Sequence, residues 1–251
     1  MNFYIILAHP ESKSFNSSIA NELRVFLENK GHKVKFNDLY KNNFNPLLSR
    51  ENFSNQSDTD LVQFPKAQLD SIINNTTSSD IEYEHKNIQW SDIIILQFPL
   101  WLYGMPAILK GWCDRVLSEG FAHQPSKNLW FDKSLLNKKK ILLSITTNGK
   151  RETYSSKGRH GSINIILWPI INAFAFSGIN IIKPFISFDV IRCGQIQRKS
   201  MIEKLKKYTE NINNAELVKI HKLNDYETNG LLKNNISPMT AGQQKPDDFI
   251  H

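Results

Sequence analysis

Residues 92–120 read DIIILQFPLWLYGMPAILKGWCDRVLSEG, and the rest of the chain is organised around them. The run Ile93–Leu96 is short, β-branched and apolar throughout, which predicts a strand buried on both faces. We expect a loop that carries Pro99, Trp101 and Tyr103 to follow it. Apolar residues then recur at helical spacing to the end of the stretch. The stretch therefore predicts a strand, an aromatic loop and a helix.

The aromatic loop is a candidate ligand site, because ligands of open parallel sheets bind beyond the carboxyl ends of the strands. Trp101 and Tyr103 offer flat faces to a planar group. Packing against neighbouring elements is the alternative for both rings. Spacing alone leaves the two readings open.

Composition indicates a globular α/β protein that contains no long apolar run. The chain has 251 residues, of which 40% are hydrophobic, and no run approaches the roughly 18 residues of a membrane span. We therefore expect no stable membrane insertion, and the first residues read as a strand rather than a signal peptide. Cys113 and Cys193 match no redox or zinc spacing, which favours free thiols in a cytoplasmic protein without a metal site.

A net charge of +7 is compatible with binding to nucleic acid. The basic residues are dispersed, with Lys138–Lys140 the single triple. A basic balance also suits an anionic cofactor and a nucleotide substrate. We therefore favour small anionic ligands and predict no nucleic-acid partner.

Strand and helix patterns alternate along most of the chain. The predicted strands are residues 3–8, 33–37, 93–96, 140–146 and 179–185. The predicted helices are residues 19–27 with Gly31 as the C-cap, 66–73, 80–90, 106–117, 163–174 with a kink or delayed start at Pro169, and 201–212. Alternation of this kind predicts a three-layer α/β fold with a five-stranded parallel sheet. A phosphate-like loop after the first strand, with aromatic and polar loops after the third and fourth, favours the flavodoxin-like strand order 2-1-3-4-5. The absence of a G-x-G-x-x-G motif argues against a dinucleotide-binding Rossmann domain.

Two segments fall outside this alternation. Residues 38–91 separate two strands by too great a length for a structureless connection, so we expect an interfacial or functional excursion. Residues 55–60 within it look like a mobile loop. We divide the chain into a catalytic domain, residues 1–212, and a C-terminal extension, residues 213–251, whose last residues from 243 are expected to be loosely held.

The loop after the first strand is rich in hydroxyl and amide side chains. Ser12, Ser14 and Asn16 stand where a helix N-terminus binds a phosphate. The same residues are also ordinary helix caps. Spacing alone does not decide between a phosphate site and a cap.

Five separate motifs give the chain a family resemblance. They are ILAHPESKSFN, FNDLYKNNFNPLLSR, QFPLWLYGMPAILKGWCDRV, SITTNGKRETYSSKGRHG and NIILWPI, spread over about residues 2–212. Together they resemble the NAD(P)H:quinone oxidoreductases of the DT-diaphorase type. The resemblance implies a flavodoxin-like homodimer with FAD at the subunit interface, which reduces quinones by a two-electron ping-pong hydride transfer from NAD(P)H.

The resemblance also implies roles for individual residues. Tyr154 and His160 match the catalytic pair that handles charge at the flavin, where a phenol and an imidazole placed as donors lower the barrier. The implied cofactor-binding residues are His9, Ser14, Phe15, Asn16, Ser17, Gln63, Pro99, Leu100, Trp101, Leu102, Tyr103, Thr146, Thr147, Asn148, Gly149, Tyr154 and Arg198, with Gln63 reaching the cofactor of the other subunit. The implied substrate residues are Trp101, Tyr103, His123, Asn148, Phe176 and Arg192.

The chain departs from the family pattern around the acceptor pocket. Residues 101–104 are Trp-Leu-Tyr-Gly where the family commonly has Gln-Trp-Phe-Gly, and Asn148 replaces the first of two glycines. His123 and Pro125 stand at the positions of two pocket tyrosines, and Arg192 stands at that of a pocket histidine. The cofactor and hydride step are therefore better supported than any named quinone. Two other functions stay open, namely a regulatory flavoprotein subunit of a glutathione-gated potassium efflux system and an azo- or nitroreductase.

Overall fold

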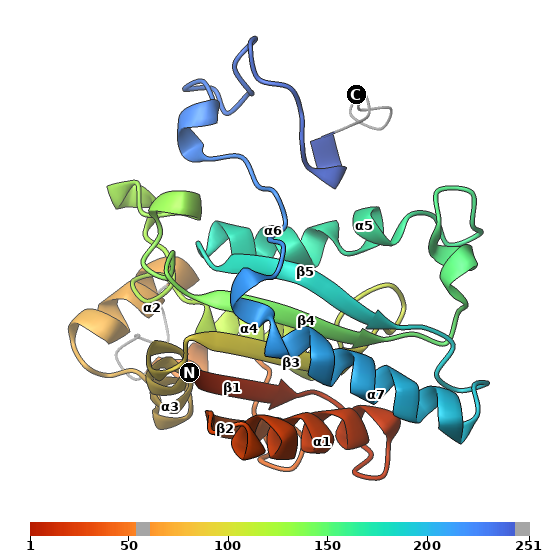
Figure 1. Ribbon diagram of the computed structural model, residues 1–251. Coiled ribbons are helices and arrows are strands. Elements are labelled where there is room, and N and C mark those ends of the chain that lie inside the picture. The colour runs from red at the N-terminus through yellow and green to blue at the C-terminus, as the bar shows by residue number, and fades with distance from the viewer. Residues whose placement is uncertain (54–60, 244–251) are drawn as a thin grey trace.

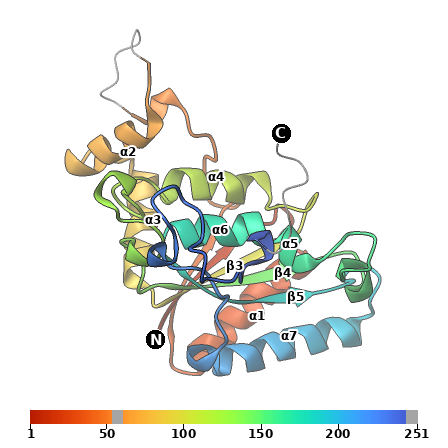
Figure 2. The ribbon, with the colours of Figure 1, turned by 90° about the horizontal axis from the view of Figure 1, so that it is seen from above.

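The computed structural model describes residues 1–53 and 61–243. Within them, five parallel strands form one sheet in the order β2-β1-β3-β4-β5, with helices on both faces (Figures 1 and 2). The strands are β1 (Asn2–Leu7), β2 (Lys33–Asp38), β3 (Ile93–Pro99), β4 (Lys140–Thr146) and β5 (Asn180–Ser187). The α-helices are α1 (Phe15–Asn29), α2 (Phe64–Ile73), α3 (Ser79–Trp90), α4 (Ala107–Val116), α5 (Ile163–Ile166), α6 (Trp168–Phe176) and α7 (Gln195–Glu210). The predicted flavodoxin-like order is confirmed.

Alternate side chains of the central strands supply two hydrophobic cores. Phe3 and Ile5 of β1 pack into the core that contains residues of α1 and α7. Tyr4 and Ile6 pack into the opposite core together with Trp112 of α4. Because both faces are covered, the inner strands read as uninterrupted apolar runs. That is the signal by which β1, β3 and β4 were predicted.

The end of β3 differs from the prediction. Pro99 was assigned to the loop, but it is the last residue of the strand and lies opposite Thr146 of β4. The ladder tolerates a proline here because the next N–H, that of Leu100, donates to the Thr146 carbonyl at 2.9 Å. The aromatic loop therefore starts one residue later and directly from the sheet.

The excursion contains the two predicted helices, α2 and α3. α2 begins two residues earlier than predicted, at Phe64, because Pro65 is favourable in a first helical turn. α2 stands out from the body of the molecule next to the end of α4 (Figure 2). The loop predicted at residues 55–60 and the tail from residue 244 lie outside the described residues.

The remaining predicted helices are present, although several begin or end at other residues than predicted. The expected interruption is present, since α5 ends at Ile166 and α6 starts at Trp168 with Pro169 in its first turn. Gly31 follows α1 with a φ of 79°, as a C-terminal cap requires. α7 starts at Gln195, before the first predicted position. Its first turns are mostly exposed and carry no apolar stripe, so the sequence pattern did not reveal where the helix begins. In the part of the chain that the structure describes, no helix is long and apolar enough to cross a bilayer.

A buried carboxylate fixes α4, which carries the aromatic loop at its N-terminal end. Glu84 of α3 is 2% exposed and accepts hydrogen bonds from Tyr4 Oη at 2.7 Å, Asn37 Nδ2 at 2.6 Å and Trp112 Nε1 at 2.9 Å. Burial raises the pKa of Glu84, and the three donors partly oppose that shift. The network joins β1, β2, α3 and α4 and so holds α4 against the sheet.

In the described part of the extension, residues 213–243, the helical structure is limited to short 3-10 turns. Leu217 forms an isolated antiparallel bridge with Ile182 on the outer edge of β5. Two hydrogen bonds of 2.8 Å flank the bridge, from Lys183 N–H to Glu216 and from Val218 N–H to Ile181. The chain then continues past β5, drawn in blue in Figure 1. The division of domains at residue 212 stays a prediction.

Candidate active site

Three loops follow the carboxyl ends of β1, β3 and β4, where the arrowheads of Figure 1 point. We call residues 8–17, 99–106 and 146–162 the carboxyl-edge site. The strands adjoin one another there, because Leu7 lies opposite Gln97 and Pro99 lies opposite Thr146. The site collects most of the predicted cofactor residues, which are His9, Ser14, Phe15, Asn16, Ser17, Pro99, Leu100, Trp101, Leu102, Tyr103, Thr146, Thr147, Asn148, Gly149 and Tyr154.

Ser14 is the N-cap of α1, so the capping interpretation is confirmed for Ser14. Its Oγ accepts the Ser17 N–H at 3.1 Å, and Ser17 Oγ donates to the Glu11 carbonyl at 3.0 Å. The N–H groups of Phe15 and Asn16 make no hydrogen bond with any described residue. They stay available at the positive end of a 15-residue helix. Capping and anion binding are therefore compatible here.

The buried side chain of Asn16 connects the first loop of the site to the strands of the sheet. It is 4% exposed, and its Oδ1 accepts hydrogen bonds from Gln97 Nε2 at 2.8 Å and Thr146 Oγ1 at 3.1 Å. Ser144 Oγ donates to Gln97 Oε1 at 2.7 Å. Gln97 and Ser144 were missed in the sequence, although polar residues inside apolar strand runs are a usable signal. The network ties α1 to β3 and β4.

The imidazole of His9 lies next to the aromatic loop. Its ring centroid is 5.6 Å from that of Trp101, and its Nδ1 accepts the Glu11 N–H at 3.1 Å. Desolvation lowers the pKa of His9, against an opposing effect of Glu11. The neutral ring presents a flat, uncharged face beside Trp101.

Residues 101–104 form a tight turn with unusual backbone angles. Trp101 and Gly104 exchange two N–H···O hydrogen bonds of 3.1 and 2.9 Å. Leu102 and Tyr103 have φ values of 45° and 64°, in the left-handed region that normally favours glycine or asparagine. Leu102 is 97% exposed and Tyr103 is 52% exposed. The turn therefore holds two bulky side chains outward from the sheet.

The loop after β4 packs a tyrosine against a glycine. Thr147 Oγ1 donates to the Gly149 carbonyl at 3.0 Å and shapes the turn. A Cβ on Gly149 would lie 2.6 Å from Cε2 of Tyr154, so the absence of a side chain admits the phenol ring. Tyr154 is buried, whereas Asn148 is exposed at the tip of the loop.

The structure brings the two predicted catalytic residues together. The rings of Tyr154 and His160 lie 4.7 Å apart at an angle of 30°. His160 Nδ1 also lies 3.0 Å from Tyr103 Oη. The backbone N–H of His160 donates to the Thr153 carbonyl at 3.0 Å, which closes the loop around the imidazole.

Two predicted arginines lie beyond the end of β5. Arg192 donates to Asp189 Oδ1 at 2.8 Å and to the Asn148 carbonyl, which joins the loops after β4 and β5. Arg198 Nε donates to the Val190 carbonyl at 3.0 Å, and its guanidinium lies 6.0 Å from the ring of Phe15. Both cations border the carboxyl-edge site and are held by hydrogen bonds to loop residues, Arg192 to Asp189 and Asn148, and Arg198 of α7 to Val190 and Ile191.

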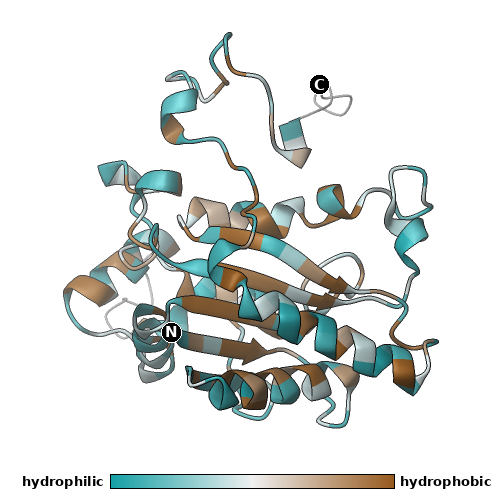
Figure 3. Cartoon of the chain, viewed as in Figure 1, coloured by the Kyte–Doolittle hydropathy of each residue, from teal (hydrophilic) through white to brown (hydrophobic). Residues whose placement is uncertain are grey.

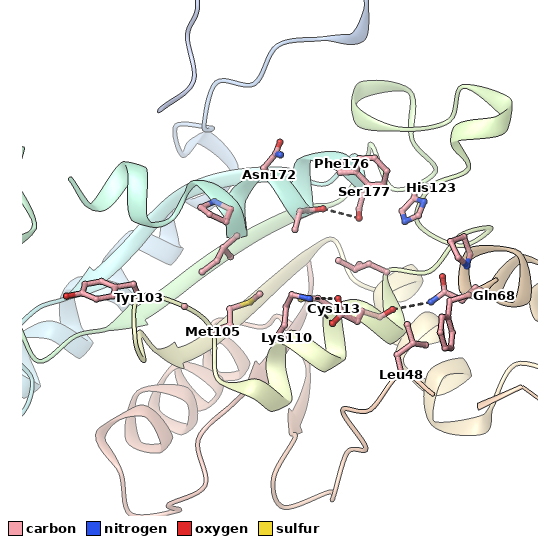
Figure 4. Close-up of a pocket in the computed structure, with 18 of the residues that line it drawn as sticks. Leu48, Gln68, Tyr103, Met105, Lys110, Cys113, His123, Asn172, Phe176 and Ser177 are labelled. Carbon is pink, nitrogen blue, oxygen red and sulfur yellow. Dashed lines mark hydrogen bonds and ion pairs between the residues drawn. The ribbon is translucent and has the colours of Figure 1, made fainter. Parts of the chain in front are cut away.

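A cavity of about 780 Å³ opens between α2, α4 and α6 and reaches the carboxyl-edge site at Tyr103. Figure 4 shows Tyr103 and Met105 at one end and His123 and Phe176 at the other. The rings of His123 and Phe176 pack edge to face at 4.7 Å, and burial lowers the pKa of His123. The predicted substrate residues therefore divide, within one chain, into a group at the carboxyl-edge site and a group at the far end of the cavity.

Gln63 also lies away from the carboxyl-edge site. It is the exposed N-cap of α2, which stands on the opposite side of the sheet in Figure 1 from the ends of the strands. The cavity wall beside it contains Lys110 and Asp114, an ion pair at 2.5 Å, and Gln68, whose Nε2 donates to the Asp114 carbonyl. These three were missed in the sequence, although the i,i+4 charge pair on the polar side of a predicted helix was visible.

Comparisons with known proteins assign the fold and the family. Residues 1–212 match a family described as having the flavodoxin-like fold. NAD(P)H dehydrogenase [quinone] 1 of Rattus norvegicus is 38% identical to the chain over 210 residues, which are 83% of this chain and 76% of the rat protein. The chain belongs to this flavodoxin-like quinone dehydrogenase family.

Other relatives place the chain within the same family. Ribosyldihydronicotinamide dehydrogenase [quinone] of Homo sapiens is 35% identical over 200 residues, covering 79% of this chain and 86% of the human one. The crystal structure of a protein assigned as a quinone reductase in Klebsiella pneumoniae matches with a TM-score of 0.83 and 28% identity, over 91% of this chain and 92% of that chain. The resemblance that the motifs indicated is therefore confirmed.

Proposed function

We propose that the protein is an FAD-dependent NAD(P)H:quinone oxidoreductase that transfers two electrons from a reduced nicotinamide to a quinone or a similar planar acceptor. The single observation that carries the proposal is the assembly of Tyr154, His160 and Tyr103 from two loops of the carboxyl-edge site. The names of the relatives supply the reaction class.

The residues present at the carboxyl-edge site fit a flavin dinucleotide. The unbonded N–H groups of Phe15 and Asn16, with the Ser14 hydroxyl beside them, suit a pyrophosphate. Trp101 and Leu102 offer exposed apolar surface along one edge of a ring system. These residues, with the loop from Thr146 to Gly149, would hold the cofactor.

FAD is favoured over FMN by what lies beyond the α1 N-terminus. The ring of Phe15 and the guanidinium of Arg198 stack loosely there and supply a flat surface and a positive charge. An adenine and its ribose phosphate would use both. A mononucleotide would leave them without a ligand.

When bound, the flavin would supply the hydride chemistry, and the chain's own residues would position the flavin and polarise it. Donors near an oxygen that gains negative charge lower the barrier. The hydroxyl of Tyr154 and Nε2 of His160 make no hydrogen bond with any residue that the structure describes, so both are available for that role. The loop that carries them is fixed by the Gly149–Tyr154 contact.

The proposal includes a homodimer whose active sites combine residues of both subunits. In one chain, Gln63, His123 and Phe176 lie away from the carboxyl-edge site. A second copy placed on the α2–α4–α6 face would bring its own three residues to the first copy's loops. The mostly apolar wall of the cavity, with Phe64, Ile170 and Phe176, suits such a contact.

We also propose a cytoplasmic location, in keeping with the two cysteines. Cys113 and Cys193 are both free, and Cys113 is buried in the α4 core. A reducing compartment keeps thiols in this state.

The decisive experiment is the absorbance spectrum of the purified protein, with identification of the released flavin by chromatography. A yellow protein that releases FAD and is bleached by NADH or NADPH supports the proposal. Turnover with menadione, an azo dye and a nitroaromatic then ranks the acceptors. A colourless protein that takes up no added FAD overturns it, and co-purification with a potassium transporter would favour the regulatory alternative.

A further inference from the structure

The conformation of residues 102 and 103 is costly for the side chains that they carry. A tight turn with two left-handed residues is usually built from Asn-Gly, because a Cβ is disfavoured there. This chain has Leu102 and Tyr103 at φ values of 45° and 64°. Strained positions of this kind persist where a side chain is needed in one place. For Tyr103 that place is next to His160.

The contact between Tyr103 and His160 crosses from one loop to another. Tyr103 follows β3 and His160 follows β4, and Oη lies 3.0 Å from Nδ1. Tyr154 packs on the same imidazole at 4.7 Å. Figure 4 shows Tyr103 at one end of the cavity that it lines, with Met105 next to it. The hydroxyl of Tyr103 is nevertheless engaged by the imidazole, since Oη lies within hydrogen-bond distance of Nδ1.

A hydrogen bond to Nδ1 decides which ring nitrogen carries the proton of a neutral imidazole. A phenol is a better donor than acceptor, because its oxygen lone pair is delocalised into the ring. When the Tyr103 hydroxyl donates, Nδ1 is the acceptor and the proton of the imidazole resides on Nε2. We propose that Tyr103 is a positioning residue, which holds His160 as the Nε2–H tautomer and so makes Nε2 the donor toward the reacting groups.

This inference rests on the proposed function for its catalytic meaning, but the tautomer is a property of the protein alone. A wrong tautomer leaves the geometry of a site intact and removes its donor, which can lower turnover by orders of magnitude. A relatively exposed pair gives a smaller effect. We expect Tyr103→Phe to lower turnover about tenfold and to leave the dissociation constant of FAD within about twofold.

The first test uses the protein without cofactor. Protein labelled with ¹⁵N-histidine is studied at pH 8.5 by long-range ¹H–¹⁵N NMR, which distinguishes the two tautomers, and His160→Gln assigns the signal. We expect Nε2–H in the unmodified protein and a mixture or the other tautomer in Tyr103→Phe. An Nδ1–H signal in the unmodified protein, or the same signal in both proteins, overturns the inference.

The second test separates positioning from direct contact with the acceptor. In the His160→Gln background, Tyr103→Phe is expected to have no further effect on turnover, because the imidazole that it orients is gone. An undiminished tenfold loss there would show that the hydroxyl acts directly and would refute the inference. Tyr83→Phe, which removes an exposed phenol hydroxyl on α3, is the matched control and should change nothing. Failure of the protein to bind FAD would sink the proposed function while leaving the NMR result readable.

Discussion

His85 of α3 stacks on Phe121, with ring centroids 3.6 Å apart and an angle of 12° between the planes. His85 Nε2 also donates to the Val116 carbonyl at 2.9 Å, at the end of α4. The pair joins the excursion to the loop that carries His123 into the cavity. Burial of His85 lowers its pKa to about 4, against a backbone hydrogen bond that acts in the opposite direction.

This depressed pKa predicts acid sensitivity. Between pH 6.5 and pH 4, His85 is protonated in the unfolded chain but not in the folded chain. The free energy of unfolding therefore falls as the pH falls through that window. The loss amounts to at most about 3 kcal/mol. Denaturant titrations from pH 4 to 7 should show a shallower pH slope for His85→Gln, which keeps a donor and does not titrate. Equal slopes for the two proteins would refute the assignment.

Gly149→Ala is expected to damage the site with little loss of global stability. Its Cβ would lie 2.6 Å from the Tyr154 ring, so the ring must move. We expect the dissociation constant of FAD to rise at least about tenfold, which corresponds to about 1.4 kcal/mol. Flavin fluorescence titration measures it. Gly104→Ala is the matched control, because its Cβ would meet nothing nearer than 3.8 Å, and an equal effect there would contradict the steric explanation.

Leu102→Gly is expected to stabilise the cofactor-free protein. Glycine adopts the left-handed conformation without strain, which should raise the free energy of unfolding by up to about 1 kcal/mol. Almost no buried surface is lost, because the Leu102 side chain is 97% exposed. Thermal melts of the protein without FAD provide the measurement. Leu47 is also exposed but has an ordinary φ, so Leu47→Gly should give no gain. A lower melting temperature for Leu102→Gly would show that the turn is unstrained.

Shared active sites predict complementation between two defective variants. His160→Ala and Phe176→Ala should each be poorly active. If a site combines His160 of one subunit with Phe176 of the other, every mixed dimer has one intact site. Co-expression should then restore about a quarter of the activity, since about half of the dimers are mixed and half of their sites are intact. Activity no higher than the average of the two variants would place both residues in the same subunit's site.

The strands were predictable because burial on both faces leaves apolar runs such as Ile93–Leu96 and Lys140–Thr146. Pro99 was misplaced, since nothing local shows that the N–H of Leu100 continues the ladder. The first turns of α7 were not predicted, because they are exposed and carry no apolar stripe. Local patterns thus revealed elements more reliably than their ends.

The candidate site was predictable only as a set of loops. Sequence spacing placed Ser14, Trp101 and Gly149 after successive strands, and the strand order brought them together. The contact between Tyr103 and His160 was not accessible, because it depends on two left-handed residues that the dipeptide Leu-Tyr does not signal. The separation of His123 and Phe176 from the loops was equally hidden, because residue order carries no information about which end of a cavity a side chain lines.

The bridge between Leu217 and Ile182 also covers part of an edge of the sheet. β5 is an outer strand, and an uncovered outer strand offers its backbone to any strand of another molecule. The extension occupies the first half of that edge, and Pro184 interrupts the donors just beyond it. A chain cut after residue 212 would lose this cover and would be prone to aggregate through edge-to-edge pairing. The extension therefore also shields this part of β5 from pairing with a strand of another molecule.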